Sequence, residues 1–281
     1  SGTAAVSALG SDSVSVIGAG AGSFADANAG SNKAVSVTGY TLTGIDAGNY
    51  DVVQPNAVSA TIHKADVIVS GSKTYDGTTS VAGSTLTATG VAGQQFSVTG
   101  AGDASNLSSK NVQSGTALAS ATGLSLGSSS NGGLASNYNA IGVAGSSYTV
   151  TAKGITLTGI SALDKIYDAT TTATLNTTNV AYSGLVGGDS VSLAGSGTGS
   201  FADKNAGANK AVTVSGYTLS GLDAGNYVVT QPSGLTASIS KASLAVSGIA
   251  AANKTYDATT GATLSGTAAV SALGSDSVSV I

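Results

Sequence analysis

The stretch KAVTVSGYTLS, residues 210–220, sets apolar residues two positions apart and then breaks the pattern with a glycine. Residues 33–43, KAVSVTGYTLT, carry the same pattern. A period of two is the spacing of a strand that buries one of its faces. Gly216 and Gly39 stand just before a tyrosine, at a place where a bulge shifts the register of a strand. These stretches predict half-buried β-strands.

The composition extends this prediction to the whole chain. An ordinary globular domain is about 25% charged, whereas this chain is 9% charged, with Asp as its acid and Lys as its base. Good helix formers are scarce, and the abundant Val and Thr favour strands. Disordered chains contain too few apolar residues to bury a core, but 41% of these residues are hydrophobic. We therefore predict an all-β fold.

The residue inventory excludes several function classes. A net charge of −4 leaves no basic stripe, so nucleic acid is not an expected partner. No apolar run approaches the roughly 18 residues of a membrane-spanning segment. The chain has no Cys and no Glu, and His63 is replaced by Ala152 and Ser240 at the matching positions. Without a nucleophile and base pair we expect no enzymatic activity, and no cofactor.

Three landmarks recur along the chain. A heptapeptide reads KTYDGTT at 73–79, KIYDATT at 165–171 and KTYDATT at 254–260. An Asp-Ala-Gly-Asn-Tyr motif ends at Tyr50 and Tyr227, and a weaker form ends at Tyr138. A lysine closes each unit, at Lys64, Lys153 and Lys241. In addition, residues 1–17 reappear letter for letter as residues 265–281, which indicates a window on a longer tandem array.

Dividing the chain after the closing lysines predicts its domain organisation. Residues 65–153 and 154–241 form two complete modules of about 88 residues. Residues 1–64 are the C-terminal part of a module, and residues 242–281 are the N-terminal part of another. Neither IHKADVIV at 62–69 nor ISKASLAV at 239–246 contains a Pro/Gly-rich spacer, and a Gly/Ser linker would behave as a random coil. We expect stiff junctions between adjacent modules.

Each module has room for six to eight short strands at the usual spacing. Two packed antiparallel sheets bury such strands on one face each, so an immunoglobulin-like antiparallel β-sandwich is the leading prediction. β-Grasp-like modules are the alternative. A solenoid fits less well, because its period is typically 20–50 residues.

The landmarks also supply candidate structural residues. We expect the second-landmark tyrosines to be buried, with each hydroxyl reaching back to the backbone of a turn; they are Tyr50, Tyr138 and Tyr227. In the heptapeptides we expect an Asx-type turn, in which the Asp accepts N–H groups two or three residues on and the Tyr ring packs beneath. These pairs are Tyr75 and Asp76, Tyr167 and Asp168, and Tyr256 and Asp257. Because Gly77 becomes Ala169 and Ala258, a strict positive φ is not expected there.

The remaining aspartates, lysines and asparagines raise two further questions, a calcium site and a side-chain cross-link. Calcium takes 6–8 oxygens, more than one Asp per heptapeptide supplies, so no metal site is expected. Seven further aspartates lack the spacing of a calcium loop and are expected to be solvated; they are Asp12, Asp26, Asp46, Asp51, Asp189, Asp203 and Asp223. Lys33 and Lys210 follow Asn28 and Asn205, so an isopeptide bond is an alternative to ordinary surface lysines. Such a bond needs a neighbouring buried acid.

Taken together, the three landmarks resemble the YDG/MBG-type repeats of large bacterial exoproteins. Those repeats build the stalks of surface adhesins, including filamentous-haemagglutinin-like proteins. The resemblance covers the whole chain as repeats. It implies a secreted protein of the bacterial cell surface with a role in adhesion, biofilm or fibre formation.

Two functions are therefore expected. The first is a structural stalk that gives extension and stiffness, with other copies as partners in a fibre, because open edge strands template pairing. The alternative is an array of multivalent repeats that bind carbohydrate, matrix or another surface. The absence of Trp favours the first, since carbohydrate sites usually use exposed aromatic residues.

Overall fold

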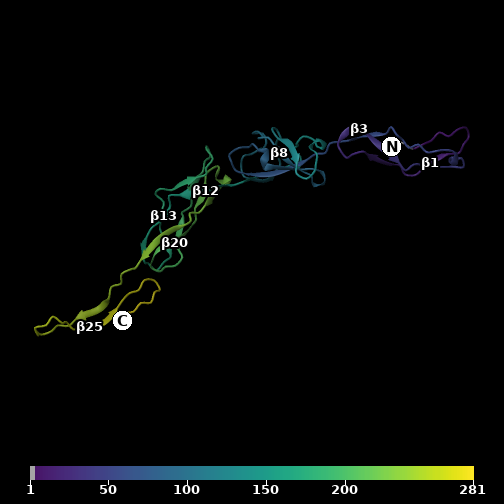
Figure 1. Ribbon diagram of the computed structural model, residues 1–281. Coiled ribbons are helices and arrows are strands. Elements are labelled where there is room, and N and C mark those ends of the chain that lie inside the picture. The colour runs from purple at the N-terminus through teal and green to yellow at the C-terminus, as the bar shows by residue number, and fades with distance from the viewer. Residues whose placement is uncertain (1–3) are drawn as a thin grey trace. The chain divides into compact units, whose positions relative to one another are not determined.

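The computed structural model describes residues 4–281, and its regular structure is almost entirely β (Figure 1). Within these residues the helical segments are single 3-10 turns: η1 (Ala47–Asn49), η2 (Gly83–Thr85), η3 (Val91–Gly93), η4 (Ala135–Asn137) and η5 (Ala224–Asn226). The prediction of an all-β fold is confirmed. None of the helical turns in residues 4–281 is long and apolar enough to cross a membrane.

The chain divides into two compact units. The first contains the residues up to Lys73 together with Thr78–Val150, and the second contains Thr74–Gly77 together with Thr151–Ile281. The heptapeptide residues 74–77 therefore belong to the second unit, although the strands on either side of them in sequence belong to the first.

The largest sheet of the first unit has six strands, in the order β10-β8-β7-β6-β11-β9. Its strands are β6 (Ile68–Thr74), β7 (Leu86–Thr89), β8 (Gln95–Thr99), β9 (Gln113–Thr116), β10 (Ser125–Ser129) and β11 (Ser147–Thr151). Alternate residues point to one face, as a pleated strand requires. They bury a core that includes Val69, Phe96, Tyr148 and Val150.

The first unit also contains residues 4–64, which form smaller sheets. β1 (Ser15–Ile17) pairs with β4 (Thr41–Thr43), and β3 (Gly30–Thr38) lies between β2 (Ala21–Phe24) and β5 (Ser59–Ile62). The side chains of these five strands are half-buried or exposed. Apolar and polar residues alternate in these strands, but the sheets bury few side chains.

In the second unit, residues 154–241 form two principal sheets around a buried core. β12 (Lys153–Thr158) lies between β17 (Ala181–Ser183) and β22 (Tyr227–Thr230). The other sheet has the order β14-β23-β20-β19-β15. Its strands are β14 (Lys165–Ile166), β15 (Thr172–Ala173), β19 (Thr198–Phe201), β20 (Gly207–Ser215) and β23 (Leu235–Ser240). The core includes Ile155, Leu157, Val212, Val214 and Ile239.

Three two-stranded pairs complete the second unit. β13 (Ser161–Ala162) pairs with β16 (Leu175–Asn176), and β18 (Ser192–Ala194) pairs with β21 (Thr218–Ser220). β24 (Ser247–Ala251) pairs with β25 (Leu264–Ala269), and almost every residue of these two strands is exposed.

The expectation of purely antiparallel modules is wrong, because the first and last segments of a repeat run parallel. β12 pairs with β22 through Lys153 and Tyr227, and β14 pairs with β23 through Lys165 and Ile239. A parallel bridge also joins Ala65 to Tyr138 in the first unit. Apolar alternation reports which face of a strand is buried, but it carries no information on the direction of the neighbouring strand.

The register shift expected at Gly216 is confirmed: Ala194 pairs with Thr218 and Thr198 pairs with Ser215, so three residues of one strand lie opposite Gly216 and Tyr217. A second register shift lies between Gly207 and Lys210 where β20 pairs with β23, at the opposite end of β20 from Gly216. Asn209 takes a φ of 49° there, a left-handed conformation that Asn tolerates better than most residues. Gly216 has a φ of 92° and ends the strand before β21. The glycine therefore lies at the bulge between β20 and β21.

Candidate functional site at the boundary between repeats

The ring of Tyr227 joins the last part of residues 154–241 to an upstream turn. η5 precedes Tyr227, which is the buried first residue of β22. Its hydroxyl accepts a hydrogen bond from the Val186 N–H at 2.9 Å and donates one to Asp189 Oδ2 at 2.7 Å. The Asp189 N–H in turn donates to the Val186 carbonyl at 3.2 Å. The phenol therefore ties down a four-residue turn through both the backbone and the aspartate.

The same arrangement occurs at the two sister tyrosines. The Tyr138 hydroxyl accepts from the Val91 N–H at 2.9 Å and donates to Gln94 Oε1 at 2.7 Å. The Tyr50 hydroxyl accepts from the Leu9 N–H at 3.0 Å and donates to Asp12 Oδ2 at 2.6 Å. All three tyrosines of the second landmark thus bond to a turn backbone as expected, but Tyr138 and Tyr227 are buried whereas Tyr50 is only half-buried.

A second tyrosine, from the heptapeptide at 73–79, reaches the same aspartate. The Tyr75 hydroxyl donates to Asp189 Oδ2 at 2.7 Å, so this one oxygen accepts from Tyr75 and Tyr227. The two rings meet edge to face, with centroids 5.4 Å apart. Tyr75 is 1% exposed, and its N–H donates to the Thr151 carbonyl at 2.8 Å. The expectation that the ring packs beneath its own turn is therefore wrong. It packs against the turn of the following repeat.

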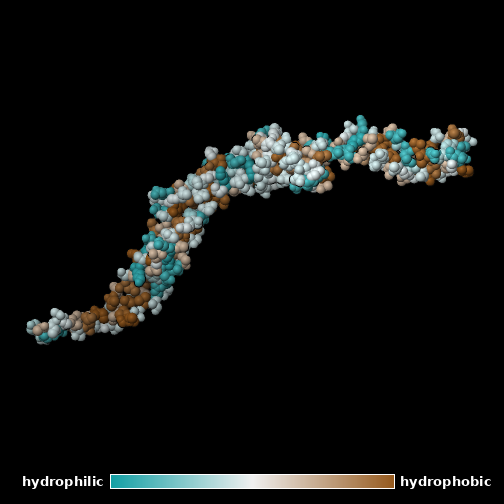
Figure 2. Space-filling view, viewed as in Figure 1, coloured by the Kyte–Doolittle hydropathy of each residue, from teal (hydrophilic) through white to brown (hydrophobic). Residues whose placement is uncertain are grey.

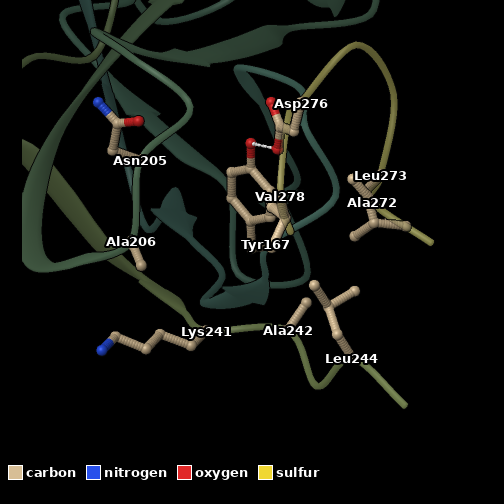
Figure 3. Close-up of a pocket in the computed structure, with 10 residues that line it drawn as sticks. All are labelled: Tyr167, Asn205, Ala206, Lys241, Ala242, Leu244, Ala272, Leu273, Asp276 and Val278. Atoms are coloured by element: carbon tan, nitrogen blue, oxygen red, sulfur yellow. Dashed lines mark hydrogen bonds between the residues drawn. The ribbon is translucent and has the colours of Figure 1, made fainter. Parts of the chain in front are cut away.

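The next heptapeptide repeats this contact at the following boundary (Figure 3). The Tyr167 hydroxyl donates to Asp276 Oδ2, and Lys204 Nζ donates to Asp276 Oδ1. The Tyr167 N–H donates to the Ser240 carbonyl at 2.8 Å, as Tyr75 does to Thr151. Beside the Tyr167 ring lies a cleft of about 280 Å³, whose lining includes Leu244 and Asp276. The third tyrosine of this series, Tyr256, is 90% exposed.

The polar half of each heptapeptide is a loop closed around a lysine. Lys165 Nζ donates to Asp168 Oδ1 at 2.7 Å and to the Thr170 and Thr172 carbonyls, each at 2.9 Å. Asp168 Oδ1 also accepts the Thr170 N–H at 2.9 Å, which is an Asx-type turn. Asp257 accepts the Thr259 N–H at 3.0 Å in the same way. These oxygens are directed at an ammonium group of the chain itself.

The heptapeptide at 73–79 shares the lysine geometry. Lys73 Nζ donates to the Thr78 and Ser80 carbonyls, each at 2.8 Å. Asp76 occupies the position of Asp168 in the sequence of this loop and is exposed. The contacts of the lysine with the backbone carbonyls recur in all three loops.

The backbone of the turn corrects one sequence inference. Gly77, Ala169 and Ala258 have φ values of 78°, 62° and 58°, so all three copies adopt the left-handed conformation. An L residue in this region costs about 1–2 kcal/mol relative to a right-handed conformation. The alanines tolerate that cost because the lysine and the aspartate fix the loop on either side of them. Replacement of Gly by Ala is therefore no guide to φ in these loops.

Two substitutions at this position test the conformational cost. Ala169→Gly should raise the free energy of unfolding by about 0.5–1 kcal/mol, because relief of the left-handed strain exceeds the freedom gained by the unfolded chain. Gly77→Ala should lower it by about 1–2 kcal/mol, since a Cβ there would also approach Val186 Cγ1 to 2.6 Å. Urea unfolding followed by far-UV circular dichroism measures both. If both substitutions changed the free energy of unfolding in the same direction, this interpretation would be contradicted.

Several of the other aspartates hold turns, which corrects the expectation that all of them are only solvated, whereas Asp51 is exposed as expected. Asp46 accepts the Ser13 N–H at 2.8 Å and Asp223 accepts the Ser190 N–H at 2.9 Å. Asp12 and Asp189 accept the tyrosine hydroxyls described above. Tight turns expose N–H groups that need acceptors, and a short carboxylate next to the turn supplies them.

The lysines considered for an isopeptide bond hold loops of the same kind. Lys33 Nζ contacts Asp26 Oδ1 and donates to the main-chain carbonyl of Asn28 at 2.7 Å. Lys210 Nζ contacts Asp203 Oδ1 and donates to the Asn205 carbonyl at 2.8 Å. The amine therefore meets the backbone of each asparagine. This geometry favours a lysine-centred loop over a side-chain cross-link.

Electrostatics favours a neutral phenol and a charged carboxylate at the boundary. Burial, followed by the hydrogen bond to Asp189, raises the pKa of Tyr227 to about 12. The hydrogen bond to Asp276 raises the pKa of Tyr167, and the Lys204 ammonium lowers the pKa of Asp276. In the lysine loop, Lys165 and the Thr170 N–H lower the pKa of Asp168 to about 2. These carboxylates remain acceptors at neutral pH.

The raised pKa of Tyr227 predicts a loss of stability in alkali. A tyrosine in the unfolded chain titrates near pH 10, whereas Tyr227 in the folded chain titrates at about 12. Its contribution to stability is therefore complete below pH 10 and is lost as the pH rises toward 12. Tyr227→Phe should be less stable at neutral pH and should lose less stability across this window. Urea unfolding at successive pH values measures this, with the exposed Tyr256→Phe as control. Equal pH slopes for the parent and Tyr227→Phe would contradict the assignment.

Sequence reasoning missed two groups of this site. The first is the acceptor at the end of each turn, Asp12, Asp189 or Asp276, although its recurrence in register was a usable signal. The second is a glutamine before each proline. Gln231 Oε1 accepts the Tyr217 N–H at 3.1 Å and its Nε2 donates to the Tyr217 carbonyl at 2.9 Å. Gln54 makes the same pair of bonds to Tyr40.

The fold and the boundary contacts define a class of tandem β-repeat protein in which a tyrosine of one repeat bonds to an aspartate of the next. The YDG domain model matches residues 1–60 and 151–234. The chain therefore belongs to the YDG domain family. No curated protein and no solved structure matches it.

Proposed function

We propose that this chain is a structural stalk or fibre segment of a secreted bacterial adhesin, with no enzymatic role. The observation that carries the proposal is the contact between consecutive repeats. Tyr75 bonds to Asp189, and Tyr167 bonds to Asp276. A buried, hydrogen-bonded ring fixes the position of both partners more strictly than a flexible linker does. Repeats joined in this way resist bending, which suits a protein that holds another domain away from a cell surface.

The bacterial cell surface is the proposed location. Membership of the YDG family and the recurrence of three landmarks support it. Adjacent repeats are the first partners, because the boundary site contains side chains from two of them. Other copies of the chain, in a fibre, are further partners in this proposal.

For the module architecture we favour a β-grasp-like repeat over an immunoglobulin-like sandwich. Support comes from the parallel pairing of the first and last strand segments beside antiparallel neighbours, as in β17-β12-β22. Sheets of an immunoglobulin-like sandwich are antiparallel.

Small-angle X-ray scattering of the 281-residue chain tests the stalk proposal. The proposal predicts an elongated particle whose maximum dimension stays constant between low and high salt. Tyr75→Ala should shorten the mean dimension by adding flexibility. A compact particle, or a parent chain as flexible as the variant, would contradict the proposal.

A specific observation also supports the second candidate, carbohydrate binding. A cleft of about 650 Å³ in residues 154–241 is lined by Thr and Ser hydroxyls, glycines, Tyr217 and the aliphatic side chains of Leu175, Val180 and Leu193, without a charged side chain. The Tyr217 hydroxyl is buried and has no hydrogen-bond partner among the described residues. In the repeat 65–153 the matching residue is Leu124, so the fold does not require this hydroxyl. Glycan-array binding that is lost in Tyr217→Phe would support this function, and absence of binding would exclude it.

A further inference from the structure

The chain enters the complete repeat 154–241 and leaves it through two segments that run side by side in the same direction. β12 pairs parallel with β22 over four consecutive residues. β14 pairs parallel with β23 over two residues. The entry segment (residues 153–167) and the exit segment (residues 227–240) are therefore joined by a parallel ladder in each of the two principal sheets of the repeat.

Further bonds hold the exit segment where it ends. The Tyr167 N–H donates to the Ser240 carbonyl at 2.8 Å, and Ser240 Oγ donates to the Lys165 carbonyl at 3.3 Å. Asp164 Oδ1 accepts the Ser238 N–H at 2.6 Å. The last residues of β23 are thus tied to the entry segment by both backbone and side chains.

Apolar side chains of both segments are buried and shield one face of the ladders from water. They are Ile155, Leu157, Tyr227 and Ile239. Figure 2 shows many hydrophilic residues on the surface of this repeat, which Figure 1 labels β12, β13 and β20. A hydrogen bond that opens inside a protein is not replaced at once by one to water, so each bond of the ladders resists opening.

The direction of the ladders decides how they respond to tension along the chain. A pull acts on the first residue of the entry segment and on the last residue of the exit segment, which lie at opposite ends of the parallel pair. The hydrogen bonds of a parallel pair are evenly spaced across the strands, so this pull shears them and loads all of them together. If the two segments were antiparallel, the pull would act at one end and would break the bonds one at a time.

The preceding repeat, residues 65–153, contains the same contacts. A parallel bridge joins Ala65 to Tyr138, and the Ala65 N–H donates to the Asn137 carbonyl at 3.0 Å. The Tyr75 N–H donates to the Thr151 carbonyl at 2.8 Å, as its counterpart does in residues 154–241. The parallel arrangement is therefore a feature of the repeat and not of one copy.

We propose that the entry and exit segments form a clamp that bears tension along the chain and keeps residues 154–241 folded while the chain is pulled. This function goes beyond the proposed stalk, which concerns extension and stiffness against bending. The clamp is a property of a single repeat and does not require the stalk function. Scattering tests bending and forced unfolding tests tension, so either proposal can fail alone.

Optical tweezers test the clamp by pulling the same folded repeat in two directions. Because the chain has no cysteine, DNA handles can be attached at two introduced cysteines of the 281-residue chain. Thr151→Cys with Lys241→Cys pulls opposite ends of the ladders and shears them. Thr151→Cys with Leu222→Cys pulls neighbouring ends, because Leu222 lies just before β22, and peels them apart. All three attachment positions are exposed.

The two directions should give different unfolding rates in a repeat of nearly equal stability. At equal force the sheared repeat should unfold at least about tenfold more slowly than the peeled repeat, since several hydrogen bonds must break together. A smaller difference, or none, would overturn the proposal.

Two core substitutions separate the clamp from general stability. Ile155→Ala truncates a buried side chain of the entry segment, and Val214→Ala truncates one of β20, outside both segments. Both should be less stable in urea. Under shear only Ile155→Ala should unfold at least about tenfold faster, because contacts already lost at the transition state set the unfolding rate. Equal acceleration by both substitutions, or none by Ile155→Ala, would overturn the proposal.

Discussion

Asp189→Ala should lower the free energy of unfolding of the second unit by about 3 kcal/mol, because two buried hydroxyls lose their acceptor at about 1–3 kcal/mol each. Tyr75 and Tyr227 both donate to Asp189 Oδ2 at 2.7 Å. Asp189→Asn should cost less, since its amide oxygen still accepts. Gln94 provides the natural precedent, accepting from Tyr138 at 2.7 Å.

Hydrogen exchange combined with urea unfolding measures this effect and locates it. Protection should fall in residues 154–241 and remain unchanged in residues 78–150, which belong to the other unit. A stability change below about 0.5 kcal/mol for Asp189→Ala, the range of an ordinary surface substitution, would contradict the role of this carboxylate. An Asp189→Asn variant as unstable as Asp189→Ala would also contradict this role.

Tyr75→Ala should have the largest effect of any single substitution considered, about 3–5 kcal/mol, as expected for truncation of a buried aromatic side chain. The ring is buried and meets Tyr227 edge to face at 5.4 Å. Tyr75→Phe keeps the ring contact and loses only the hydrogen bond to Asp189, so it should cost about 1–2 kcal/mol.

The third heptapeptide provides a matched control for this prediction. Tyr256 stands in the same motif as Tyr75 but is exposed. Tyr256→Ala should therefore change the stability by less than about 0.5 kcal/mol. Thermal and urea unfolding of the three variants give the comparison. If Tyr75→Ala and Tyr256→Ala were equally stable, the tyrosine would act within its own loop and the boundary contact would carry no energy.

The strands of this fold could be predicted from the sequence, and their partners could not. The valine alternation at 210–220 corresponds to β20, in which Val212 and Val214 are buried. The same alternation gave no indication that β22 runs parallel to β12, because the two strands are joined by residues 159–226 and the pairing is set by the whole repeat. Strand direction is a property of topology and is absent from a period of two.

The candidate site was likewise predictable only in part: its tyrosines could be found from the sequence, and their acceptor could not. The spacing of the landmarks singled out Tyr75 and Tyr227, but their common acceptor lies 114 residues from Tyr75 along the chain and in the next repeat. The position of a residue within its own repeat does not predict a contact with the neighbouring repeat. A repeated Asp at 12, 189 and 276 was the available signal, and Gln94 obscured it by taking the same place in the repeat 65–153.

The positive φ at Ala169 was also beyond sequence reasoning, for a different reason. An Ala in place of Gly usually indicates that a left-handed conformation is not needed. Here Lys165 and Asp168 close the loop with bonds of 2.7–2.9 Å, and that network holds the alanine in the strained region. The hydrogen bonds of the whole loop, and not the conformational preference of Ala169 alone, determine the φ angle at this position.

We propose that Tyr167 holds residues 242–281 in a fixed orientation on residues 154–241, and a distance measurement across that boundary within the second unit tests this most directly. Because the chain has no cysteine, spin labels can be placed at Thr213→Cys in β20 and Thr267→Cys in β25, both at exposed positions of the second unit. Double electron–electron resonance should give one narrow distance distribution in the parent and a broad one in Tyr167→Ala. A broad distribution in the parent, or a narrow one that Tyr167→Ala leaves unchanged, would contradict the claim.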